Sequence, residues 1–368
     1  MIAVAASPSS RQPAGGPRVR PRVRWLAVWS RAVVVPAWRR AVATWVGCAI
    51  VAAVLFGPTA MRPSDLTGLA LHNLGAGAVL GVTWLLVFVP TARVIVQPAA
   101  GYLGSLPGDP RAARLIAALA LIGLQLPWLV LWIIGEDLLG VAIVLATTLF
   151  AAGLASWRPP RRRPSFPAWR RPGAALRAIH RRALQRRAGD ALLRGAGIAA
   201  LAGMAAGLLV RNNHLDGQPA GVLGASVIAV VLVPAQVGAA HVALTTHRET
   251  TWLAGSSGIS RGARIAALVH VIALVHLTAA AIAVVVAMVV AGGDPWLPVL
   301  ALATALGTAL LEVRAMLIHE ASPTVAARVV IGAVGAAATA VVCLAVLGAS
   351  GALATVATGA AALLLVKP

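Results

Sequence analysis

The sequence predicts an all-α protein, a polytopic transmembrane helix bundle of about ten spans with both termini in the cytoplasm. Of its 368 residues, 60% are hydrophobic and only 11% are charged, whereas soluble domains are about 45–50% apolar and about 25% charged. The apolar residues form long runs between short polar connections, and the basic residues gather on one predicted side of these runs. Composition and charge therefore both indicate a membrane protein.

One basic segment, residues 157–194, divides the chain. It holds twelve arginines and a single acid, Asp190. Each arginine at the bilayer centre costs about 2.5–3.5 kcal/mol, so this segment must lie in water. We expect a cytoplasmic linker that binds anionic lipid headgroups, with a first membrane half of four spans at 44–156 and a second of six at 195–368. With its arginines beside apolar spans, the net charge of +21 does not indicate a nucleic-acid partner.

Residues 1–43 are predicted to form a cytoplasmic basic tail followed by an interfacial amphipathic helix. The start of the chain is rich in Pro, Ser, Gly and Arg and lacks the apolar core of a signal peptide. From Arg22 to Arg40, arginines alternate with Trp25, Trp29 and Trp38, a mixture typical of a helix on the headgroup surface. A disordered basic arm is the alternative.

Ten apolar runs follow, each near the roughly 17–25 residues that a spanning helix needs. They are Thr44–Met61, Leu74–Arg93, Ala113–Ile134, Leu138–Ser156, Gly195–Val210, Ala220–Ala243, Ile265–Ala291, Trp296–Leu311, Val329–Leu347 and Ala352–Val366. With the amino terminus inside, the outer connections contain only two of the 31 basic residues, Arg62 and Arg211. This bias predicts the orientation, and a bacterial plasma membrane is the expected location.

The two halves resemble each other at an offset of 150 residues. The stretch that begins at Gly101 aligns with the one that begins at Thr251, and an R-x-x-R follows a glycine-containing turn in both. Each half then reads as four spans in the same order and orientation, which would be a parallel repeat. Coincidence among alanine-rich helices is the alternative.

Missing motifs exclude several kinds of chemistry. The only lysine is Lys367, so the chain has no G-x-x-x-x-G-K-[ST] phosphate-binding loop and cannot itself be a P-loop ATPase. It has no H-E-x-x-H motif, and no paired carboxylates lie within the predicted spans. Ion-coupled carriers commonly place an acid there, so that class is disfavoured. We expect no enzymatic activity, metal or cofactor.

A few polar residues within the spans could line a transport path. The candidates are Gln125, Gln236, His241, His270 and His276. His270 and His276 are six residues apart, about 240° around a helix, so they do not share a face. Together with His241 they could line a path or bind haem. The alternative is that each histidine makes a hydrogen bond across a helix interface.

The cytoplasmic loop at His247–Arg264 carries the most distinctive pattern. Its acid, apolar pair, Gly/Ser turn and arginine resemble the loop after the second helix of ABC-2-type exporter permeases, E-x-x-x-x-x-L-L-x-x-P-[VIL]-S-R. Glu249, Leu253 and Ile259–Arg261 match this pattern in residue type, but Gly258 replaces the proline. The resemblance implies a docking surface for a separate ATP-binding subunit. The candidate coupling residues are Tyr102, Leu103, Arg111 and Arg114 in the first half, which lacks the acid, and Glu249, Trp252, Leu253, Arg261 and Arg264 in the second.

By this resemblance we expect the membrane-spanning permease subunit of an ABC-type exporter, although that family usually has six spans. The sparse polar lining favours an amphiphilic substrate, and a homodimer is a conceivable assembly. Two other classes stay open: a non-transporting membrane scaffold or assembly factor, and a membrane-embedded lipid-modifying enzyme that uses the histidines.

Overall fold

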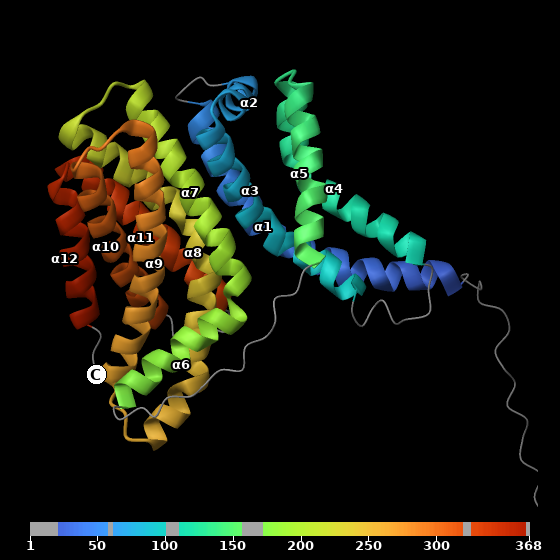
Figure 1. Ribbon diagram of the computed structural model, residues 1–368. Coiled ribbons are helices and arrows are strands. Elements are labelled where there is room, and N and C mark those ends of the chain that lie inside the picture. The colour runs from blue at the N-terminus through green and yellow to red at the C-terminus, as the bar shows by residue number, and fades with distance from the viewer. Residues whose placement is uncertain (1–20, 58–61, 101–109, 157–171, 319–324, 366–368) are drawn as a thin grey trace, which may run out of the picture.

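The computed structural model describes residues 21–57, 62–100, 110–156, 172–318 and 325–365. Its secondary structure there is all α-helical (Figure 1). The helices are α1 Pro21–Phe56, α2 Pro63–His72, α3 Leu74–Ala100, α4 Pro110–Ile134, α5 Leu138–Ser156, α6 Pro172–Arg187, α7 Gly189–Asn212, α8 Gly217–Ser256, α9 Arg261–Ala291, α10 Trp296–Ile318, α11 Val325–Leu347 and α12 Ser350–Leu364.

Eight of the helices in the described ranges, α3, α4, α5 and α7 to α11, are long and apolar enough to cross a membrane. The predicted polytopic helical membrane protein is thereby confirmed. Two of the ten predicted spans are not among the eight. The first falls in the second half of α1, and the last is α12, whose 15 residues extend about 23 Å, short of a bilayer core of roughly 30 Å.

The predicted interfacial helix is part of α1, which continues without a break toward the first predicted span. One face of its first half, Trp29, Val33, Ala37 and Ala41, is buried in a cluster with residues of α3, α4 and α5. This spacing of four residues places the side chains on one stripe of the helix. Other helices therefore cover the apolar face that we expected to meet lipid.

The helices of the second half pack closely because small residues line their contacts. Gly203 and Gly207 of α7 face Ala283 and Ala287 of α9, and a Cβ at Gly203 would overlap the Ala283 carbonyl oxygen. A small residue at every fourth position lets two helices approach until their backbones touch, which is a common way of joining helices in lipid. This contact holds α7 and α9 at a fixed distance.

Helix packing follows the same order in the two halves. Within the described residues, α3 packs on α1, α4 and α5, and α4 also packs on α1 and α5. In the same way α8 packs on α7, α9 and α10, and α9 also packs on α7 and α10. The halves meet where α1 contacts α7 and α8, and where α3 contacts α7.

Helix α8 is much longer than the span predicted within it. Its 40 residues extend about 60 Å, roughly twice the hydrocarbon core of a bilayer. The predicted cytoplasmic loop His247–Arg264 is therefore mostly helical. Its first part continues α8 to Ser256, a turn follows at residues 257–260, and its last residues begin α9. Figure 1 shows the last turns of α8 extending past α6, at the end of the molecule opposite α2.

The predicted sidedness can be tested by labelling single cysteines in intact cells. A cysteine at Asn213 or Gly293 should react with an impermeant thiol reagent, because both positions lie in predicted outer connections. A cysteine at Ser257, in the turn between α8 and α9, should react only after the membrane is opened. Labelling of Ser257→Cys in sealed cells would reverse the orientation.

Candidate functional site

The turn between α8 and α9 presents the residues that we predicted for coupling in the second half. Trp252 is 72% exposed and Leu253 is 44% exposed on the last turns of α8. Ser260 caps α9 by accepting a hydrogen bond from the Ala263 N–H at 3.3 Å. Gly258 has φ of +70°, which proline, fixed near −65°, cannot adopt. A proline could therefore not stand at position 258 in this turn.

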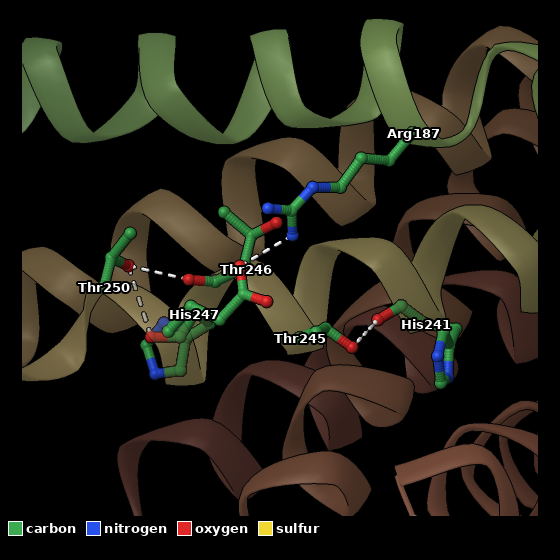
Figure 2. Close-up of polar contacts among 7 residues, drawn as sticks. Arg187, His241, Thr245, Thr246, His247 and Thr250 are labelled. Carbon is green, nitrogen blue, oxygen red and sulfur yellow. Dashed lines mark hydrogen bonds and ion pairs between the residues drawn. The ribbon is translucent and has the colours of Figure 1, made fainter.

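Helix α6 is attached to this extension of α8. Figure 2 shows Arg187 reaching from α6 toward α8, where it pairs with Glu249 at 2.6 Å. Leu176, His180 and Leu184 form the buried face of α6, and α6 packs on α8 and α9. Burial lowers the pKa of His180, and its contact with the Leu176 carbonyl partly offsets this effect. Part of the predicted linker is thus a helix docked on protein.

The remaining coupling candidates lie at the starts of two helices. Arg261 and Arg264 belong to the first turn of α9, where Arg264 donates a hydrogen bond to the Thr251 carbonyl at 3.4 Å. Arg111 and Arg114 occupy the equivalent first turn of α4 and are exposed. Tyr102 and Leu103 lie outside the described residues.

The five predicted path-lining residues do not come together. His241 and His270 are exposed on α8 and α9. Gln125 is fully buried on α4, and neither of its amide atoms has a hydrogen-bond partner among the described residues. Gln236 of α8 and His276 of α9 are buried and line one small cavity.

That cavity contains an acid that the sequence analysis missed. Glu312 of α10 is fully buried, and its Oε2 lies 2.9 Å from His276 Nε2. Thr304 and Thr308 of α10 also line the cavity, whose volume is about 10 Å³. We refer to Gln236, His276, Thr304, Thr308 and Glu312 as the polar cavity. Glu312 is a single carboxylate, so it does not form the carboxylate pair whose absence was predicted, but it places one acid inside the bundle just beyond the predicted eighth span.

A signal for Glu312 was present in the sequence. The predicted eighth span ends at Leu311, directly before Glu312. The apolar pattern continues beyond it, however, through Met316 to Ile318, and α10 extends to Ile318. A charged residue followed by further apolar residues indicates a polar group inside the bundle.

A second cavity is large and apolar. It has a volume of about 580 Å³, within the usual range of about 300–1,000 Å³ for small-molecule sites. Residues of α1 to α5 and Leu201 of α7 line it, and Trp84, Trp128 and Trp132 form its aromatic wall. Trp84 and Trp128 pack edge to face with ring centroids 5.2 Å apart. We refer to this space as the aromatic cavity.

The polar groups of the aromatic cavity are few. Trp132 donates a hydrogen bond from Nε1 to Thr67 Oγ1 at 2.9 Å. The buried Nε1 of Trp84 has no hydrogen-bond partner in the described part of the chain. A buried donor without a partner is costly.

Within the described ranges, no group of three or more His, Cys, Asp or Glu side chains is arranged to hold a metal ion. No protein-family model matches the chain, and neither the curated proteins nor the solved structures include a significant match.

Proposed function

We propose that this chain is the membrane-spanning subunit of an ABC-type exporter, which moves an amphiphilic substrate with the help of a separate cytoplasmic ATP-binding subunit. The observation that carries the proposal is the exposure of Trp252 and Leu253 at the end of a helix that extends well beyond a bilayer core. A large apolar pair exposed on a helical projection suits a protein partner, because buried aromatic residues dominate interface energies.

The architecture supports a mechanical role for this surface. Because α8 is one continuous helix from Gly217 to Ser256, a force applied at Trp252 would be transmitted along it into the bundle. The Arg187–Glu249 pair would make α6 move with it. The matching order of packed helices in the two halves supports a parallel repeat, in which the R-x-x-R at the start of α4 would be the second docking point.

The aromatic cavity supports an amphiphile as the substrate. Its walls are almost entirely apolar and aromatic. A lipid-like molecule with a long apolar chain would fit such walls. Sugars and inorganic ions would leave most of their polar groups without partners, at a cost that opposes binding.

The exposed arginines of α6 support a role in binding anionic lipid. Arg177, Arg181 and Arg186 are exposed on a helix whose opposite face is buried. Near an anionic surface each contributes about 1 kcal/mol, so α6 would hold the end of α8 close to the predicted inner leaflet.

The docking surface is tested by replacing both Trp252 and Leu253 with alanine. Co-purification of the ATPase should be lost, because removal of a central aromatic anchor costs about 2 kcal/mol or more, a weakening of roughly thirtyfold. The variant should insert and fold as the wild type does, since neither side chain is buried. Affinity purification from solubilised membranes with quantitative mass spectrometry measures the effect.

Trp296→Ala is the matched control, because Trp296 is also partly exposed, at 43%, but begins α10 in a predicted outer connection. It should retain the ATPase. If the Trp252→Ala/Leu253→Ala protein binds the ATPase as well as the wild type does, this surface is not the docking site.

A further inference from the structure

The His276–Glu312 pair lies deep in the bundle. Its side chains are 3% and 0% exposed. Fifteen residues separate His276 from the end of α9 at Ala291, and sixteen separate Glu312 from the start of α10 at Trp296. Both are therefore about 22–24 Å from the ends of α9 and α10 that are joined by residues 292–295. Glu312 is six residues, about 9 Å, from the other end of α10 at Ile318, but both side chains are buried, and a buried charge is expensive unless it is paired.

The contacts of His276 determine how many protons the pair carries. Nδ1 lies 3.0 Å from the Ile272 carbonyl oxygen, which can only accept a hydrogen bond, so Nδ1 carries a proton. In neutral histidine Nε2 would then carry no proton, and its lone pair would face the Glu312 carboxylate at 2.9 Å. Two lone pairs at this distance repel. A second proton is therefore required, either on Nε2 or on Glu312.

The polar cavity beside the pair has room for a water molecule to carry this proton away. A volume of about 10 Å³ is close to the minimum for one water molecule, which needs two to four polar partners. Candidate partners are Gln236, Thr304 Oγ1 and the carboxylate of Glu312. In the described part of the chain, Thr304 Oγ1 has no hydrogen-bond partner, and neither oxygen of Glu312 accepts a well-aligned hydrogen bond.

Few other charged groups face the pair. On α11, Arg328 is buried at 2% exposure. One turn further along α11, a Cβ at Gly332 would lie 3.7 Å from Glu312 Cγ. Arg328 is therefore one helical turn from the part of α11 that contacts Glu312, and α11, Val325–Leu347, contains no other charged residue. Among its described residues, α12 has no titratable side chain, and Gln236 is the one polar residue among those of α8 that line the cavity.

The remaining titratable groups of the packed helices do not line the cavity. Those of α7 lie near its two ends, His270 of α9 is exposed, Arg314 of α10 is half-buried, and the histidines of α6 and α8 lie near the end of the bundle at α6. They are Asp190, Arg194 and Arg211 of α7, His241, His247, Arg248 and Glu249 of α8, Arg261, Arg264 and His270 of α9, Arg314 of α10, and His180 and the arginines of α6.

We propose that His276 and Glu312 form a binding site for one exchangeable proton, and that its occupancy controls how tightly α9 packs on α10. With the proton bound, the pair is an attractive contact between an imidazolium and a carboxylate, or its neutral equivalent. When the proton leaves through the cavity, neutral His276 and the Glu312 carboxylate repel each other across the interface. This role goes beyond the proposed exporter function and needs no ATPase.

The test is the pH dependence of thermal unfolding of the full-length protein in lipid nanodiscs. For the wild type, the ratio of folded to unfolded protein should fall by up to about tenfold for each pH unit as the proton leaves, since a single proton is linked to packing. In Glu312→Gln this fall should disappear, because the amide N–H of glutamine can donate to the Nε2 lone pair and no exchangeable proton is needed.

Glu136→Gln is the matched control, because Glu136 is an exposed acid in the turn between α4 and α5, and it should keep the wild-type pH dependence. His276→Gln provides a second readout if Glu312→Gln does not fold. It leaves Glu312 as a buried acid without a basic partner, so the fall should move to a different pH range from that of the wild type. The proposal is overturned if either variant of the pair keeps the wild-type profile, or if the wild-type stability does not change with pH. It is also overturned if sodium at fixed pH stabilises the wild type but not Glu312→Gln, since the site would then bind a cation.

Discussion

Replacement of Gly203 by valine should strongly destabilise the second half. A Cβ at this position would overlap the Ala283 carbonyl oxygen, and a backbone atom cannot rotate away as a side chain can. Overpacking in a core usually costs about 1–3 kcal/mol, and forcing α7 away from α9 should exceed that range. We expect a lower thermal unfolding midpoint and a large loss of monodisperse protein in size-exclusion chromatography.

Gly153→Val on α5 is the control for helix propensity alone. Gly153 is exposed, and a Cβ there would meet no other atom within 4 Å. The change should have little effect on either measurement. If Gly203→Val behaved like Gly153→Val, the close approach of α7 and α9 would be incorrect.

Filling the aromatic cavity should abolish binding of an amphiphile. Gly81 of α3 lines this cavity, and a Cβ there would meet no atom within 4 Å, so Gly81→Phe should place its ring in the cavity without disturbing the helices. A fluorescent fatty-acid ester titrated into protein in nanodiscs should bind at least about tenfold more weakly, a loss of about 1.4 kcal/mol. Thermal stability should stay near the wild-type value.

The matched variant is Gly123→Phe on α4. It adds the same ring where a Cβ also meets no atom within 4 Å, and Gly123 does not line the aromatic cavity. Its affinity for the ester should equal that of the wild type. Equal affinities for Gly81→Phe and Gly123→Phe would show that the ester binds elsewhere.

The spans were predictable because hydrophobic length is a property of contiguous residues. Eight of the ten predicted runs coincide with long apolar helices of the structure. The termini of these helices were less predictable. Residues 247–256 are polar enough to suggest a loop, but they continue α8 as a helix, since backbone hydrogen bonds and the contact with α6 do not depend on hydropathy.

The contents of the two cavities could not be predicted from one sequence. Gln236, His276 and Glu312 come from three different helices, so their meeting depends on how those helices are rotated. Hydropathy constrains the rotation only weakly when a helix is apolar on all sides. The aromatic cavity likewise combines α1 to α5 with a residue of α7.

The central claim, that this chain is the membrane subunit of an ABC-type exporter, is tested most directly by purifying the wild-type protein from its native membranes in a mild detergent. We predict that a separate protein with a P-loop co-purifies in a fixed stoichiometry, and that the complex hydrolyses ATP faster when an amphiphile is added. A preparation that contains no ATPase, although the bundle is folded, would contradict the exporter function and favour a membrane scaffold.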